Sequence, residues 1–181
     1  MAIAYINMNK TTNIIEEEFE SLTHGKVLTS DIVSHIKSFL EEDPSATYSL
    51  VIGTDSQERI HQSTGKKQIH LVTALVVYRR GYGGRYFWKR KFASDIHTLR
   101  QKVYEETSTS LEFASVFVPI LQKSLNGKMP KYNLEIHIDV GEHGETRSMI
   151  KEVVGMVTGS GYVAKTKPFA YGASNIADKH T

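Results

Sequence analysis

The sequence contains no cysteine, and this absence excludes several kinds of chemistry. Disulfide bonds, thiolate nucleophiles, iron–sulfur clusters and cysteine-ligated zinc sites all require that residue. No apolar run approaches the roughly 18 residues that a membrane-spanning helix requires. The N-terminal segment also lacks the basic start and long apolar stretch of a secretory signal peptide. We therefore expect a cytoplasmic protein without a membrane partner.

Length and charge balance are ordinary for one globular domain. The chain has 181 residues, of which 40% are hydrophobic and 23% charged, so a core is expected and global disorder is not. No repeat, low-complexity segment or linker divides it, and a net charge of +2 indicates no particular partner. We interpret residues 1–28, which are polar with an acidic centre, as an N-terminal extension and residues 29–181 as the domain.

Hydrophobic periodicity predicts an alternation of strands and helices that follows an N-terminal helix at Ser30–Glu42. The expected elements after it are strands at Tyr48–Asp55, Ile69–Arg80 and Arg85–Ala93, a long helix from Asp95 that Pro119 kinks or splits, a strand at Leu134–Asp139, a helix from about Thr146, a strand at Tyr162–Lys167 and a helix at Ala173–Thr181. In this βββαβαβα order an antiparallel meander precedes parallel crossovers. We therefore predict an α/β fold with a mixed five-stranded sheet and an extra N-terminal helix.

Two aspartates stand where strands are expected to end. Asp55 closes the first predicted strand and Asp139 the fourth. If these strands are parallel neighbours, the two carboxylates meet beyond their carboxyl ends, where ligands gather. Clustered carboxylates repel each other unless they share a proton or hold a cation, and hard oxygen donors suit Mg²⁺ or Mn²⁺. Each aspartate alone has a plainer interpretation as a turn residue, so the pair and the element order together favour a metal site.

Two further acids are candidates for the same site. On a helical wheel Glu106 stands at the edge of the apolar stripe of the long helix, whereas Glu105 faces away. Glu106 is therefore the better candidate to face the sheet, and a salt bridge at the helix boundary is the alternative. Asp178 lies in the last predicted helix, where an acid near the C-terminus gains nothing from the helix dipole. A solvated aspartate is the alternative there.

Several separated motifs resemble those of a known bacterial family. They are Thr54-Asp55-Ser56-Gln57, His137-x-Asp139-Val140-Gly141, Thr146-Arg147-x-Met149-Ile150-Lys151-Glu152-Val153-Val154-Gly155 and Ala173-Ser174-x-x-Ala177-Asp178-Lys179. They are similar to motifs of the YkuK-like family, which is classed as ribonuclease H-like, and the likeness covers about residues 28–181. The resemblance implies a ribonuclease H fold whose carboxylates are matched by Asp55, Glu106, Asp139 and Asp178. It also implies two divalent ions, Mg²⁺ or Mn²⁺, that would clamp the attacking water and the leaving oxygen of a phosphodiester.

A basic stretch is a candidate surface for nucleic acid. Six basic residues and no acid lie from Arg79 to Lys91, with aromatic residues interleaved. This pattern is typical of phosphate contact with base stacking, although the two-residue period of a hairpin with one solvated basic face explains part of it. Arg147 and Lys151 would either steer a phosphate or lie on an ordinary solvated face. The candidate nucleic-acid-binding residues are Arg79, Arg80, Arg85, Lys89, Lys91, Arg147 and Lys151.

The histidines provide weaker alternatives. His137, His143 and His180 would carry protons or bind metal, but a structural histidine is the commoner case. A transition-metal site of His137, Asp139, Glu142 and His143 matches no known zinc spacing. We expect a metal-dependent nuclease or other phosphodiester-processing enzyme that acts on DNA or RNA. The alternatives are a nucleic-acid-binding module without turnover and the hydrolysis of a small phosphorylated metabolite.

Overall fold

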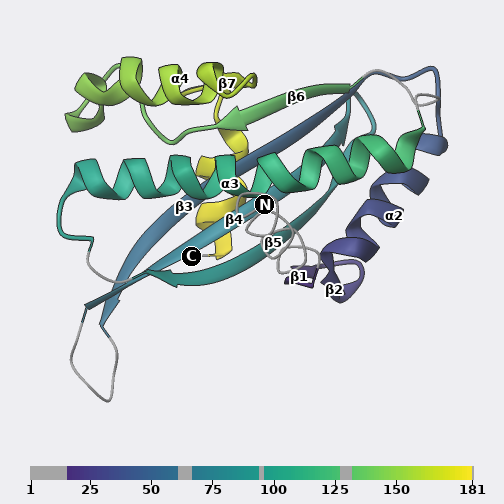
Figure 1. Ribbon diagram of the computed structural model, residues 1–181, viewed down its shortest axis with the longest axis horizontal. Coiled ribbons are helices and arrows are strands. Elements are labelled where there is room, and N and C mark those ends of the chain that lie inside the picture. The colour runs from purple at the N-terminus through teal and green to yellow at the C-terminus, as the bar shows by residue number, and fades with distance from the viewer. Residues whose placement is uncertain (1–15, 61–66, 94–95, 127–131, 181) are drawn as a thin grey trace, which may run out of the picture.

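A mixed β-sheet organises the chain in the computed structural model, which describes residues 16–60, 67–93, 96–126 and 132–180 (Figure 1). Seven strands, in the spatial order β2-β1-β5-β4-β3-β6-β7, form one sheet in these residues. The strands are β1 (Glu18–Ser21), β2 (Gly25–Leu28), β3 (Tyr48–Ile60), β4 (Lys67–Arg79), β5 (Gly83–Ala93), β6 (Tyr132–His137) and β7 (Val163–Lys165). The helices are α2 (Thr29–Glu41), α3 (Leu99–Leu125) and α4 (Ile150–Gly159), and the helical turns are η1 (Glu145–Met149), η2 (Gly172–Ala177) and η3 (Asp178–His180).

The strand pairing confirms the predicted α/β class and the predicted mixed sheet. Strands β3, β4 and β5 form the antiparallel meander, whereas β3 pairs with β6 and β6 with β7 in parallel. The meander turns sharply after β4 because Gly81 and Gly83 adopt φ of 83° and 82°, which glycine reaches without steric strain. The order of helices between the parallel strands is also the predicted one.

Two strands near the N-terminus were not predicted, so the sheet has seven strands rather than five. Strands β1 and β2 pair as a hairpin, and β1 extends the sheet at the edge of β5, where Glu20 lies opposite Trp88. Each strand has four residues, and Phe19 is fully buried among acidic neighbours. Such short strands with one buried residue leave no clear two-residue period in the sequence.

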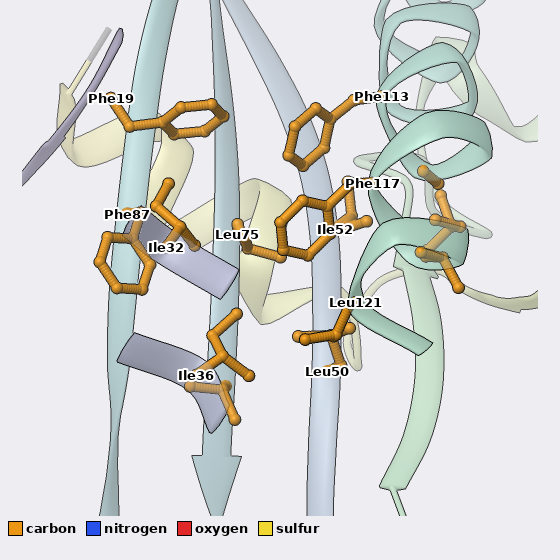
Figure 2. Close-up of a cluster of buried hydrophobic side chains, with 14 of the residues drawn as sticks. Phe19, Ile32, Ile36, Leu50, Ile52, Leu75, Phe87, Phe113, Phe117 and Leu121 are labelled. Carbon is orange, nitrogen blue, oxygen red and sulfur yellow. The ribbon is translucent and has the colours of Figure 1, made fainter. Parts of the chain in front are cut away.

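Helices α2, α3 and α4 pack on one face of the sheet and enclose the main core (Figure 1). Figure 2 shows Phe113, Phe117 and Leu121 of α3 pointing toward Leu50 and Ile52 of β3. The opposite face is covered by η2, whose Ala177 packs against residues of β4 and β5 in a smaller cluster. In the described part of the chain, no helix has the length and hydrophobicity that crossing a membrane needs.

Several element boundaries differ from the predicted ones. Helix α3 begins at Leu99, where the side chain of Thr98 accepts a hydrogen bond from the backbone N–H of Gln101 at 3.1 Å and caps the helix. Asp95, the predicted start, lies outside the described residues. Helix α3 continues through Pro119 as one helix and is not split there. The last predicted helix is a π-helical turn followed by a 3₁₀ turn.

Candidate active site

The parallel pairing of β3 with β6 brings Asp55 and Asp139 to the same end of the sheet. The last parallel pair is Gly53 with His137, and each aspartate follows two residues later. Strand β3 continues to Ile60 against β4, so Asp55 does not close its strand as predicted. It lies where β3 loses its parallel neighbour, which is the place where ligands collect in sheets of this kind.

The carboxyl group of Asp55 lies within electrostatic reach of two other acids. Burial is the main reason that the pKa of Asp55 rises from 3.8 to about 6. The ammonium group of Lys102 and the backbone N–H of Ser56 oppose this rise, and the carboxylates of Asp139 and Asp178 add to it. Asp178 is itself exposed in η3, on the side of the sheet that η2 covers. Asp55, Asp139 and Asp178 therefore share one electrostatic environment.

Glu106 approaches β3 from helix α3. Its side chain is 4% exposed, and its Oε1 accepts a hydrogen bond from Ser56 Oγ at 2.6 Å, while Lys102 Nζ lies 3.8 Å away. Burial raises the pKa of Glu106 to about 8, with further contributions in the same direction from Asp55 and Asp139. Glu106 rather than the half-buried Glu105 faces the sheet, as the helical wheel predicts.

Ser56 and Asp55 are neighbours on β3, so their side chains point to opposite faces of the strand. Glu106 contacts the face of β3 that carries Ser56, and the side chain of Asp55 points to the opposite face of that strand. A buried chain of hydroxyls fixes the helix in this position. Ser110, one turn beyond Glu106, donates to Thr54 Oγ1 at 2.8 Å, and Thr54 shares a hydrogen bond of 3.0 Å with Thr73 of β4.

Asp139 is paired through one oxygen and unpaired through the other. Its Oδ2 lies 3.0 Å from Lys167 Nζ. Its Oδ1 is buried and has no hydrogen-bond partner among the described residues. The backbone N–H of Lys167 donates to Val140 O at 2.8 Å, which holds the lysine beside the segment that carries Asp139. A buried acceptor without a donor is uncommon in proteins, and a water molecule or an ion is a common partner of such an atom.

The C-terminal turns are attached to the sheet by two histidines. The backbone N–H of Gly172 donates to His137 Nδ1 at 2.9 Å, so the neutral ring carries its proton on Nε2 and donates to Glu135 Oε2 at 3.1 Å. Burial lowers the pKa of His137. At the other end of the turns, His180 stacks on Trp88 with a centroid separation of 3.7 Å. These contacts place Asp178, and they give His137 a structural role.

The four acids do not form a finished ligand cluster. Within the described ranges, no three histidine or carboxylate side chains lie close enough to hold one metal ion. The alternative site of His137, Asp139, Glu142 and His143 is likewise not assembled there. Four acids from separate elements lie at one end of the sheet. Two of them, Asp55 and Glu106, have raised pKa values.

Comparison with known proteins shows the family of this chain. The family model described as Ribonuclease H-like matches residues 31–181. The chain belongs to the ribonuclease H-like family. A relative from Bacillus subtilis (strain 168), whose name reads "Uncharacterized protein YkuK", is 32% identical over 171 residues, which cover 90% of this chain and 96% of the relative. No solved structure matches the chain. The resemblance inferred from the motifs is thereby confirmed.

Three residues of this candidate site were missed by the sequence analysis. They are Ser56, Lys102 and Lys167, which contact Glu106 or Asp139. Lys102 precedes Glu106 by four residues, and that spacing on a helix is a readable signal for an ion pair. No comparable signal joins Lys167 to Asp139, because their contact depends on the placement of the segment after β7.

The basic stretch from Arg79 to Lys91 is partly neutralised in this ribonuclease H-like fold, by three glutamates that lie outside it in the sequence. The ion pairs join Arg79 and Arg85 to Glu42 at 3.9 and 3.6 Å, Arg90 to Glu20 at 2.6 Å, and Lys89 to Glu17. Phe87 and Trp88 are buried, whereas Tyr82 is 75% exposed. The premise of an unopposed basic field is therefore wrong for four of the six cations. Contact of nucleic acid with Arg79, Arg80, Arg85, Lys89 and Lys91 stays a prediction, and Arg80 and Lys91 are exposed.

Proposed function

We propose that this chain is a divalent-metal-dependent nuclease, or a closely related phosphodiester-processing enzyme, that acts on DNA or RNA. The observation that supports it is the meeting of acids from β3, α3, the segment after β6 and η3 at one end of the sheet. Asp55 and Glu106 are there in environments that penalise their charged forms. Perturbed carboxyl groups of this kind gather at functional sites more often than elsewhere.

The residues present fit a hard divalent cation. All candidate ligands are oxygen donors, which Mg²⁺ and Mn²⁺ prefer. Asp139 Oδ1 is a buried acceptor without a partner among the described residues. Asp55 and Asp139 would hold the ion, with Asp178 as a further ligand. Glu106 faces the other side of β3 and would not bind the same ion directly. When bound, the ion would lower the pKa of a coordinated water and stabilise the leaving oxygen of a phosphodiester.

The chain's own side chains prepare the charges of this site. At pH 7 Asp55, with a pKa of about 6, is mostly ionised, whereas Glu106, with a pKa of about 8, holds a proton. Ser56 donates to one oxygen of Glu106 and thereby orients the carboxyl group. Lys167, whose side chain is half-exposed, balances Asp139 and presents positive charge at the edge of the site, where a phosphate would approach.

One observation favours a second candidate, a nucleic-acid-binding module that has kept the fold without turnover. Lys102 and Lys167 already oppose Glu106 and Asp139, and the described residues contain no assembled metal cluster. Internal cations of this kind can replace a metal in balancing the carboxylates. The two candidates therefore differ in whether added metal produces cleavage.

Cleavage of labelled single-stranded DNA, single-stranded RNA and an RNA–DNA hybrid tests the proposal. The chain is incubated with Mg²⁺, with Mn²⁺ or with a chelator. We expect metal-dependent products from the native chain and none from Asp55→Asn or Asp139→Asn. Glu106→Gln is assayed in the same way, with Glu105→Gln as its matched control. Binding of an oligonucleotide without cleavage of any substrate, with either metal, would favour the non-catalytic candidate instead.

A further inference from the structure

A pocket of about 360 Å³ lies in the segment that follows Asp139. Its lining residues are Glu142, His143, Arg147, Ile150 and Lys151. The sequence motifs singled out Arg147 and Lys151, but the carboxylate site uses neither. A pocket with two cations and a histidine, built on the segment that leaves the candidate active site, is suited to an anionic group.

The pocket is fixed to the carboxylate site through the backbone at Gly141. Its N–H donates to Thr146 Oγ1 at 3.3 Å, which closes the loop that carries the lining residues. On its other side Gly141 packs against Lys167, and a Cβ at this position would lie 3.2 Å from Lys167 Cβ. Since Lys167 pairs with Asp139, the loop of the pocket contacts the residue that balances the site.

A second attachment joins the pocket to helix α3. Arg100 binds Glu152 Oε2 of α4 at 2.5 Å, and Tyr104 donates to the same oxygen. These two residues of α3 flank Lys102 and lie within a turn or two of Glu106 on the same helix. The contacts of Glu152 with α3 therefore fix the position of the pocket relative to Glu106.

The two cations of the pocket are open to solvent. Arg147 and Lys151 are exposed, one turn apart, and neither forms an ion pair with a described residue. Glu152, next to Lys151, is engaged by Arg100. The lining contains one acid, Glu142, so two cations leave net positive charge. By contrast, glutamates bind Arg79, Arg85, Arg90 and Arg100.

We propose that this pocket binds a phosphate group, and that in the proposed nuclease it holds a backbone phosphate of the strand being processed, beside the one that meets the carboxylates. The identification of the ligand as part of a nucleic-acid strand rests on the proposed function. The guanidinium fork of Arg147 matches the geometry of phosphate oxygens, and Lys151 adds a point charge. His143 supplies an N–H donor, and Ile150 an apolar wall.

Binding without metal tests this subsite separately from catalysis. The full chain is titrated, in the presence of a chelator, into a fluorescent single-stranded oligonucleotide at two salt concentrations. The double variant R147A/K151A should bind about tenfold more weakly. For this variant, the slope of the logarithm of the binding constant against the logarithm of the salt concentration should be smaller in magnitude by about one. The control variant K37A/K123A removes the same charge from lysines of α2 and α3 that do not line the pocket, and it should bind like the native chain.

Competition by inorganic phosphate and by adenosine 5′-monophosphate distinguishes the sources of the phosphate group. Displacement by either one from the native chain, but not from R147A/K151A, supports the subsite. A mononucleotide that binds as tightly as the oligonucleotide would indicate a small substrate. Native affinity and slope in R147A/K151A, or an equal loss in K37A/K123A, would overturn the subsite even if the native chain cleaves. Loss of binding in R147A/K151A with no cleavage by the native chain would leave the subsite standing and remove the nuclease.

Discussion

Replacing Glu106 by glutamine tests whether burial keeps this carboxyl group protonated. Glutamine has the shape of the neutral acid, and its carbonyl oxygen can still accept the hydrogen bond from Ser56 Oγ. In the native chain the folded state binds this proton up to a pKa of about 8, whereas the unfolded chain releases it near 4.5. The contribution to stability is therefore complete below pH 4.5 and is lost as the pH rises toward 8.

The size of the effect follows from these two pKa values. The difference between 4.5 and about 8 corresponds to about 5 kcal/mol at roughly 1.4 kcal/mol per pKa unit. Relative to Glu106→Gln, the native chain should lose stability by about 1.4 kcal/mol for each pH unit between 4.5 and 8. The variant should therefore match the native chain near pH 4.5 and exceed its stability at pH 8.

Urea unfolding between pH 4.5 and 9, with a chelator present, measures this difference. The neighbouring variant Glu105→Gln is the control, because its side chain lies outside the contact with Ser56 and should leave the pH dependence of the native chain unchanged. Parallel stability curves for the native chain and Glu106→Gln would refute the reasoning, since they would mean that the Glu106 carboxyl group titrates equally in both states.

Three further predictions concern other parts of the site and its support. Mn²⁺ at a concentration about 100 times its Kd should stabilise the native chain by about 2.7 kcal/mol in a thermal shift assay, and Asp139→Asn should abolish this effect. Ser110→Ala removes the donor to the buried Thr54 and should cost about 1–2 kcal/mol in urea unfolding; an unchanged midpoint would mean that the hydroxyl chain does not fix α3. Lys89→Ala should lower stability by about 1–3 kcal/mol, because Lys89 is 13% exposed, pairs with Glu17 and lies over two phenylalanine rings; a loss confined to nucleic-acid binding would contradict this role.

Local patterns in the sequence were enough to predict the order of the elements from α2 onward and the mixed sheet. The apolar run from Tyr48 and the alternation after Leu134 are properties of neighbouring residues, and they mark buried strands before any partner is known. The element order then restricts the topology, because a meander followed by right-handed crossovers allows few arrangements. Asp55 and Asp139 were found in this way, since parallel pairing of their strands places both at one sheet end.

Tertiary structure alone decided which charges oppose one another. Glu42, Glu20 and Glu17 pair with four cations of a basic stretch from which they are distant in the sequence, and Lys167 reaches Asp139 from the segment after β7. Such pairs have no period and no fixed spacing, because they arise where the folded chain returns to itself. The raised pKa values of the acids have the same origin. Desolvation depends on what covers a carboxyl group, and that is determined by packing rather than by its neighbours along the chain.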